Sequence, residues 1–284
     1  MEKPTLKDWP WEIRPAGNFP DLKLSELWRY KDLLFRFVKR DLIVNYRQTI
    51  LGPLWVLLEP LVATLVYFTI FTSIMKIPVG ETPPLLFYLS GIILWIYFQD
   101  TVNGISATFQ QNASLLSKVY FPRIILPFSF VVSKFTRLCI QFILLAAVYL
   151  FYVTQGANIH VTVYLLLVPL LLVVFVLFTL GCGLILASLS ARYRDVQNLM
   201  MFLLRLLMFA SPVFYPYSLV SGPLRTVIGL NPLTPLMEAF RFSLFGTGIL
   251  HTAHLLYGLI ATLVVLLLGL FSFGKVEQNV IDTI

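Results

Sequence analysis

Residues 45–63 read NYRQTILGPLWVLLEPLVA, and within this stretch the chain changes from polar, hydrogen-bonding residues to a long apolar run. A bilayer core accommodates about 20 apolar residues per helix, so the run that begins at Leu51 is long enough to enter a membrane. Gly52 and Pro53 suit the end of one helix and the start of the next, because proline is tolerated in a first helical turn. The stretch therefore predicts a corner at which an interfacial helix turns into a membrane span.

The composition of the whole chain agrees with a membrane location. Apolar residues make up 58% of the 284 residues and charged residues only 12%, well outside the usage of soluble proteins. Residues 1–50 are polar and contain no apolar segment or cleavage site of a secretory signal peptide. We expect an all-α polytopic membrane protein in which residues 1–50 form a cytoplasmic arm and an amphipathic interface helix, and residues 51–284 form the transmembrane domain.

Hydropathy on the scale of one bilayer crossing predicts six transmembrane helices. They are residues 51–75, 85 to about 114, 126–153, 161–189, 196–216 and 253–273. Between the last two, residues 217–248 are interrupted by prolines and contain Glu238 and Arg241, which are three residues apart and suited to pair. Irregular backbone at membrane depth must be covered by protein or water, so we predict re-entrant helices here rather than a seventh crossing.

The distribution of Lys and Arg orients these spans. With the N-terminus inside, the basic residues fall on or near cytoplasmic segments, except Lys76, Arg225 and Arg241. This distribution follows the positive-inside rule and places both termini in the cytoplasm.

Apolar and basic side chains alternate ahead of the first span. Ser25 can cap a helix that Glu26 begins with the favourable charge, and Leu34, Phe37 and Arg40 follow within it. Such a basic amphipathic helix suits an anionic inner leaflet, and a solvated linker helix is the alternative.

A polar stripe follows the apolar start of the second span. Gln99, Asn103, Ser106 and Gln110 recur at offsets that place them within about 40° of one another on a 3.6-residue helix, with Asp100 beside them. Polar groups at this depth need either a water-filled path or hydrogen bonds from a neighbouring helix, and the sequence leaves both interpretations open.

Two further charged residues lie within predicted spans. Glu59 is near the inner end of the first span, where it is either a gate for substrate or the partner of a basic residue such as Arg205 or Lys134. Arg205 lies deep in the fifth span, where snorkelling to water is only partly available, and Glu59 or Asp100 is a candidate partner.

The sequence shows no catalytic or metal-binding pattern. It has no G-x-x-x-x-G-K-[ST] loop for ATP phosphates, and no Ser-His-Asp or paired-carboxylate set. Cys139 and Cys182 lie singly in apolar runs, and His251 and His254 have no third ligand beside them. We expect a chain that is not an enzyme and binds no metal or cofactor itself.

Several segments together resemble one family. They are RDLIVNYRQTILGPLWVLLEPL, LLSKVYFPRIILP, SARYRDVQNL, SPVFYP, NPLTPLMEAFR and the C-terminal KVEQNVIDTI. From about Leu24 to Ile284 the chain resembles the membrane subunit of bacterial ABC-2 type exporters, and within these the permeases for lipid-linked polysaccharides.

The resemblance implies a homodimer around a channel, with each copy bound to a separate ATPase subunit that holds ATP and Mg²⁺. It implies export of a polyprenyl-diphosphate-linked glycan, such as O-antigen, across the bacterial cytoplasmic (inner) membrane. The alternatives are export of teichoic acid, capsule or a small amphiphile, or a membrane-embedded glycan-modifying enzyme. Membrane lipids are the remaining expected partners, and no nucleic acid is expected.

The resemblance also assigns roles to residues. ATPase coupling falls on the amphipathic helix and two cytoplasmic loops, at Leu34, Phe37, Arg40, Lys118, Tyr120, Pro122, Arg123, Arg192, Tyr193, Arg194 and Asp195; the alternative is that these loops only set the topology. Substrate entry falls at Arg47 and Glu59, and an outer gate at Tyr215, Pro232, Glu238 and Arg241. A sugar polymer favours aromatic faces and hydrogen bonds, so the predicted channel lining comprises Tyr67, Phe71, Trp95, Phe98, Gln99, Asp100, Asn103, Ser106 and Gln110.

Overall fold

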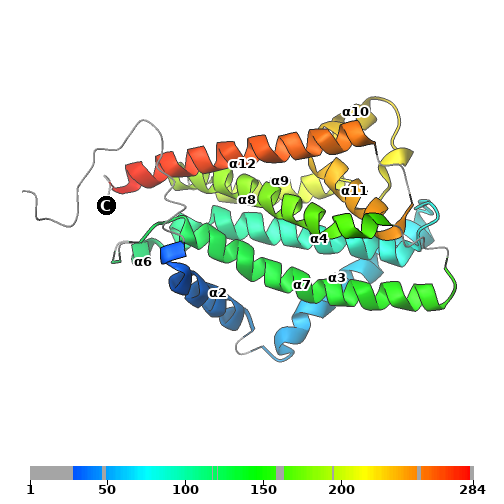
Figure 1. Ribbon diagram of the computed structural model, residues 1–284, viewed down its shortest axis with the longest axis horizontal. Coiled ribbons are helices and arrows are strands. Elements are labelled where there is room, and N and C mark those ends of the chain that lie inside the picture. The colour runs from blue at the N-terminus through cyan, green and yellow to red at the C-terminus, as the bar shows by residue number, and fades with distance from the viewer. Residues whose placement is uncertain are drawn as a thin grey trace, which may run out of the picture.

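The chain is described by a computed structural model that covers residues 28–46, 49–116, 118–119, 121–157, 163–193, 195–247 and 251–281. In these residues the regular structure is helical, without a strand (Figure 1), which confirms the all-α prediction. The helices are α2 (Lys31–Tyr46), η1 (Gly52–Leu54), α3 (Trp55–Phe68), η2 (Thr69–Ile74), α4 (Pro84–Ser106), α5 (Thr108–Gln111), α6 (Ala113–Leu116), α7 (Ile125–Thr154), η3 (Val163–Leu167), α8 (Val168–Arg192), α9 (Val196–Phe209), η4 (Tyr217–Leu219), α10 (Pro223–Leu230), α11 (Leu233–Phe245) and α12 (Thr252–Ile281).

Among the described residues, five helical segments are long and apolar enough to cross a bilayer. The predicted fifth span, residues 196–216, contains only the 14-residue α9 and a turn after it. At 1.5 Å per residue α9 spans about 21 Å, less than the roughly 30 Å hydrocarbon core. The boundary predicted near residue 216 is therefore wrong, and the number of six crossings stays a prediction.

The second predicted span also ends earlier than expected. α4 stops at Ser106, and the short helices α5 and α6 replace its predicted continuation. Asn112 donates from its side-chain amide to the carbonyl of Thr108 at 3.0 Å, and Thr108 donates to the carbonyl of Gly104 at 3.5 Å. Such bonds compete with regular helix geometry, so the periodicity of the polar stripe does not extend to Gln110.

α4 is the centre of the bundle. It lies between α7 and α8, while α3 and α12 lie farther out (Figure 1), and most of its side chains are buried. Trp95 and Phe98 pack in its core, where the ring of Phe98 stacks on that of Phe178 in α8 at 6.1 Å. The helix that sequence analysis assigns to the channel is therefore also the main packing element of the single chain.

Small residues bring α8 and α12 together. A Cβ added at Gly269 would lie 2.5 Å from the carbonyl oxygen of Gly181, and one added at Gly181 would meet the backbone of Leu266 at 2.8 Å. Membrane helices pack closely where such residues meet, because association depends on van der Waals contact rather than on a hydrophobic driving force. The two glycines thus fix α12 against α8.

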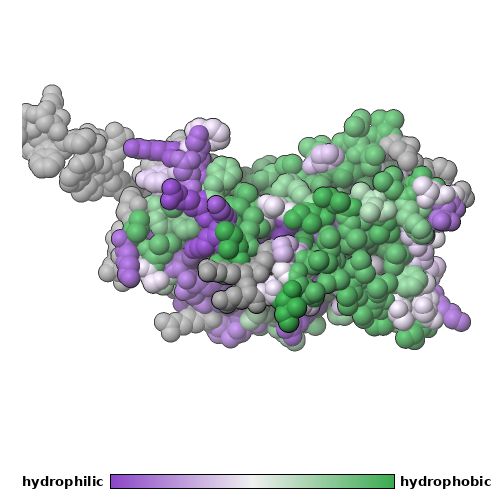
Figure 2. Space-filling view, turned by 90° about the horizontal axis from the view of Figure 1, so that it is seen from below, coloured by the Kyte–Doolittle hydropathy of each residue, from purple (hydrophilic) through white to green (hydrophobic). Residues whose placement is uncertain are grey.

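The surface separates into two regions along the long axis. Figure 2 shows a broad hydrophobic surface at one end and a mixed, largely hydrophilic surface at the other. Exposed apolar side chains such as Val62 on α3 and Ile143 and Leu150 on α7 belong to the hydrophobic surface of these helices. A bilayer would cover this part, and α2 would lie outside it on one side.

Candidate functional site

Charged side chains from three helices meet at the inner end of α3. Arg137 of α7 donates from Nη2 to Oε2 of Glu59 in α3 and from Nη1 to Oδ2 of Asp100 in α4, both at 2.9 Å. Lys134, on the same face of α7, donates from Nζ to the same oxygen of Asp100 at 3.0 Å. We call these residues, Glu59, Asp100, Lys134 and Arg137, the inner ion network; its two positive and two negative charges balance.

The first turns of α3 set the depth of this network. Trp55, Glu59, Val62 and Val66 follow helical spacing along one exposed face of α3. Tryptophan favours the membrane–water interface, and Glu59 lies one turn, about 6 Å, farther along the helix. The inner ion network therefore lies near the headgroup level of one leaflet, where ionised groups are tolerated better than at the bilayer centre.

The sequence predicted a basic partner for Glu59, which the structure confirms, but that partner is not one of the candidates named from the sequence. Glu59 pairs with Arg137, not with Lys134 or Arg205, and Asp100 pairs with Lys134 and Arg137. Arg205 lies exposed on α9 and forms no ion pair or hydrogen bond with any residue that the structure describes. Arg137 escaped the sequence analysis, although its spacing from Lys134 within an apolar run is a signal that could have identified it.

The polar stripe is only partly open in the single chain. Gln99 accepts a hydrogen bond from Nε1 of Trp95 at 2.9 Å, and Ser106, which is buried, donates to the carbonyl of Asn103 at 2.8 Å. Gln110 donates to the carbonyl of Ser190 in α8 at 3.4 Å. Only the bond of Gln110 joins two helices, while the other two lie within α4; Gln99, Asp100 and Asn103 remain partly exposed, and Gln110 is exposed.

The predicted aromatic channel residues lie in two different environments. Trp95 and Phe98 are buried in the packed core and do not reach the surface of this chain. Tyr67 in α3 and Phe71 in η2 are partly buried, and their ring centroids lie 4.4 and 4.8 Å from that of Phe214. These rings join the outer end of the first span to the turn that follows α9.

Arg241 organises the predicted outer gate. Its side chain is buried, and it donates from Nη1 to the carbonyl of Pro212 at 2.5 Å and from Nη2 to the carbonyl of Val213 at 2.8 Å. The guanidinium also lies 3.7 Å from the ring centroid of Phe87. Burial lowers the pKa of Arg241 to about 10, so the side chain stays charged at neutral pH. The turn after α9 is therefore held by a cation on a distant helix.

The expected pair of Glu238 and Arg241 is confirmed, at 3.8 Å between Oε1 and Nη1. Oε1 of Glu238 also accepts a hydrogen bond from the backbone nitrogen of Tyr217 at 3.4 Å. Burial raises the pKa of Glu238, and the nearby charge of Arg241 opposes this shift. Of the other predicted gate residues, Tyr215 donates to the carbonyl of Phe209 at 2.8 Å and Pro232 directly precedes α11.

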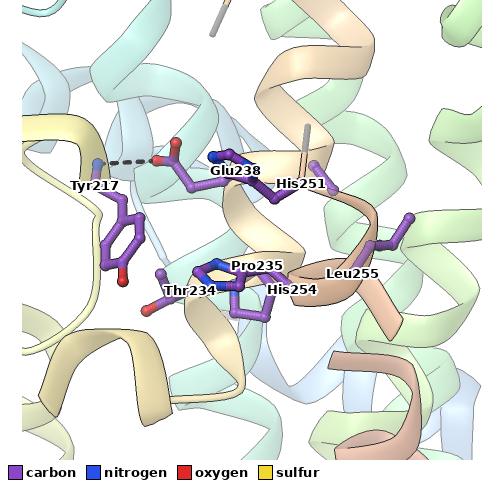
Figure 3. Close-up of a pocket in the computed structure, with 8 residues that line it drawn as sticks. Tyr217, Thr234, Pro235, Glu238, His251, His254 and Leu255 are labelled. Carbon is purple, nitrogen blue, oxygen red and sulfur yellow. Dashed lines mark hydrogen bonds between the residues drawn. The ribbon is translucent and has the colours of Figure 1, made fainter. Parts of the chain in front are cut away.

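A small pocket opens beside this gate. Figure 3 shows Glu238 pointing toward the backbone nitrogen of Tyr217, with both histidines extending from the start of α12. The lining residues are Tyr217, Thr234, Pro235, Glu238, Ala239, His251, His254 and Leu255. The ring centroids of His251 and His254 are 5.7 Å apart. Within the described part of the chain, no group of three or more His, Cys, Asp and Glu is arranged to hold a metal ion.

α2 packs on the N-terminal end of α7. Phe37 is buried, with its ring 5.8 Å from that of Phe121, and Leu34 is partly buried in the same cluster. Both side chains therefore contact their own chain, which leaves little of Phe37 for a partner subunit. Arg40 remains exposed beside them and pairs with Asp41 at 2.8 Å.

The first predicted coupling loop is tied to the C-terminal helix. The backbone nitrogen of Arg123 donates to Oε1 of Glu277 in α12 at 2.8 Å, and Nη1 of Arg123 donates to the carbonyl of Glu277 at 3.4 Å. Pro122 is partly buried, whereas Lys118 and its neighbour Val119 are exposed. This loop thus presents an exposed tip on a base that α12 holds.

The second loop is exposed where it is described. Arg192 ends α8 and places its guanidinium 5.4 Å from the ring centroid of Tyr193, and Asp195 precedes α9. Arg47, Tyr120 and Arg194, which were also assigned roles from the sequence, lie outside the described residues.

The long apolar helices, joined by ion pairs between α3, α4 and α7, are those of an all-helical, multi-pass membrane protein. Residues 32–245 match the family model described as ABC-2 type transporter, and the chain belongs to this family. It is 33% identical over 246 residues to the O-antigen export system permease protein RfbA of Myxococcus xanthus, covering 86% of this chain and 92% of that protein. It is 25% identical over 249 residues to the protein of the same name from Klebsiella pneumoniae, covering 87% and 93% of the two chains.

A relative named for a different polymer also matches. The chain is 24% identical over 248 residues to the polysialic acid transport protein KpsM of Escherichia coli, covering 86% of this chain and 93% of that protein. The family inferred from the sequence segments is thereby confirmed.

Proposed function

We propose that this chain is the transmembrane subunit of an ATP-driven exporter that moves a lipid-linked polysaccharide of the O-antigen type from the inner to the outer face of the cytoplasmic membrane. The observation that carries the proposal is the similarity to O-antigen export permeases over 86% of the chain. Because the sequence has no phosphate-binding loop, ATP and Mg²⁺ belong on a separate ATPase subunit.

The surface for that ATPase lies at the cytoplasmic end. Lys118 and Val119 in the first loop and Arg192 and Tyr193 in the second are exposed. A short loop seated in a groove of the ATPase would transmit movement to the helices that it joins. The hydrogen bonds of Arg123 to Glu277 extend this path to α12.

A second copy of the chain would explain why the exposed face of α9 carries both apolar side chains and an arginine. Phe202 and Leu206 are 57% and 51% exposed on this helix, and Arg205 lies exposed between them. An arginine in contact with hydrocarbon is unfavourable by about 2.5 to 3.5 kcal/mol on insertion scales. Pairing of two chains across α9 would cover the apolar side chains and give Arg205 a water-filled channel or a partner residue. We therefore propose a homodimer bound to two ATPase subunits.

Reconstitution in liposomes tests the proposed function. The chain is co-expressed with the ATPase subunit encoded beside it, purified and supplied with an undecaprenyl-linked O-antigen. We expect stable copurification and ATP hydrolysis that rises when the glycan is added. We also expect that ATP changes how much of the glycan an added glycosidase can cleave, because the glycan moves across the liposome membrane. Chemical modification of the glycan by this chain alone would instead support an enzyme.

A further inference from the structure

Arg137 has unused capacity for binding an anion. It contacts Glu59 and Asp100 through one nitrogen each, and its Nε is buried without a hydrogen-bond acceptor in the described part of the chain. A guanidinium binds phosphate best through two parallel N–H donors. The present contacts therefore satisfy the charge of Arg137 without using its full donor geometry.

Glu59 is the member of the inner ion network that another anion can replace most easily. Its side chain is 48% exposed, compared with 13% for Arg137. Ion pairs with an exposed partner contribute little free energy, because the surrounding water competes for the exposed charge. A ligand that arrives from the exposed side of α3 meets Glu59 first.

Release of Glu59 would leave the helices in place. Gln141, which lies one turn beyond Arg137, is buried and donates from Nε2 to the carbonyl of Val56 in α3 at 3.2 Å. Asp100 continues to hold Lys134 and Arg137 against α4. The contact between α3 and α7 therefore does not depend on Glu59 alone.

We propose that Arg137 and Lys134 bind the phosphate groups of a lipid in the inner leaflet, and that Glu59 is the exchangeable counter-ion of the ligand-free site. The two cations lie close together, since both contact Oδ2 of Asp100, and they lie at the headgroup level marked by Trp55. Two neighbouring cations suit a diphosphate better than a headgroup with one charge. The inference rests on the proposed function, to which it adds the residues that bind the headgroup at entry.

Binding of farnesyl diphosphate to the purified full-length chain in nanodiscs of zwitterionic lipid tests the site. Farnesol and inorganic pyrophosphate serve as probes of the two halves of this ligand. We expect both to bind at least about tenfold more weakly than farnesyl diphosphate, because each lacks either the charge-assisted hydrogen bonds or the membrane-anchored chain. Equal binding of pyrophosphate and farnesyl diphosphate would identify a soluble-phosphate site and overturn the lipid assignment.

Substitutions with opposite expected signs separate a binding site from a structural ion pair. Arg137→Gln and Lys134→Gln are each expected to weaken farnesyl diphosphate binding about tenfold. Glu59→Gln is expected to strengthen it several-fold, because it removes the competing carboxylate while keeping the side-chain volume. Arg225→Gln, which removes an exposed cation at the outer end, is the matched control and should leave affinity unchanged.

A purely structural network predicts that Glu59→Gln weakens binding or leaves it unchanged, and either result overturns the proposal. Thermal unfolding and size-exclusion chromatography verify that the variants fold, and Arg137→Lys provides a charge-retaining substitute if Arg137→Gln does not fold.

ATP-driven export of the glycan is measured in a separate assay, which distinguishes failure of the site from failure of the proposed function. Undiminished export by a folded Arg137→Gln chain would remove this site and leave the proposed function standing. Wild-type headgroup binding without any ATP-driven export would remove the function and leave the site.

Discussion

Arg241 in α11 donates from Nη2 to the backbone carbonyl of Val213 at 2.8 Å, across 28 positions of sequence. The same guanidinium reaches the carbonyls of Pro212 and Phe87 and lies over the Phe87 ring. One buried cation thus holds the turn after α9, the start of α4 and α11 together.

Replacement of Arg241 by methionine should therefore destabilise the protein. The change leaves buried carbonyls of Pro212 and Val213 without donors, and we expect a loss of about 3 kcal/mol. Thermal unfolding in detergent measures the loss. Arg225→Met, at an exposed position of α10, is the control, and an equal effect of the two substitutions would contradict the role of Arg241.

Gly91 should be intolerant of even one methyl group. A Cβ at this position would overlap Nη2 of Arg241 and lie 3.0 Å from the carbonyl oxygen of Val213. We expect Gly91→Ala to lower the melting temperature by several degrees. Ser90→Ala removes only a local hydroxyl bond to the carbonyl of Phe87 and should be milder. If the two substitutions have the same effect, the close approach of Arg241 is not what limits position 91.

The contact between α8 and α12 predicts a second glycine effect. Gly269→Val would place its side chain against the carbonyl of Gly181, so α12 must move away from α8. We expect a lower yield of folded protein and a lower melting temperature. Leu267→Val on the exposed surface of α12 is the control. Wild-type stability of the Gly269→Val chain would show that the helices separate easily.

Pairing of two copies through α9 predicts a cross-link. In a chain carrying Cys139→Ser and Cys182→Ala, a cysteine in place of Phe202 should form an oxidant-dependent disulfide between copies, because two α9 helices would face each other. A cysteine in place of Val173, which is exposed on α8, should not. Non-reducing gel electrophoresis reports the dimer. Cross-linking through α8 alone would place the interface elsewhere.

The link between Arg123 and Glu277 predicts partial uncoupling. Glu277→Ala removes the carboxylate that accepts the backbone N–H of Arg123, so movement of the loop should reach α12 less efficiently. We expect ATP hydrolysis by the assembled complex to persist while export per ATP falls. Glu81→Ala, outside the cytoplasmic end, is the control. A proportional fall in hydrolysis and export would indicate that Glu277 acts on assembly instead.

The long apolar runs made the helical class predictable from sequence, because each crossing requires about 20 apolar residues. Helix ends were less predictable. Side-chain bonds of Thr108 and Asn112 accompany the early end of α4, and a contact with distant Arg241 shapes the turn after α9. Such local competition and long-range contact leave little trace in a hydropathy pattern.

At the candidate site, the partners within the inner ion network were likewise hard to predict from the sequence. Glu59 and Asp100 were recognised as charges that need partners, yet Arg137 lies 78 and 37 positions away from them. Only the packing of α7 against α3 and α4 decides that Arg137, rather than Arg205, faces both carboxylates. The pair of Glu238 and Arg241 was predictable because both residues belong to one helix turn.

The most direct measurement of the central claim is ATP-dependent movement of an undecaprenyl-linked O-antigen across liposomes that contain this chain and its ATPase. A matched preparation contains an ATPase that binds but does not hydrolyse ATP. The account predicts that glycan appears on the opposite face only when both subunits and hydrolysis are present. Movement without the ATPase, or a stable and hydrolysing complex that leaves the glycan where it was, would contradict it.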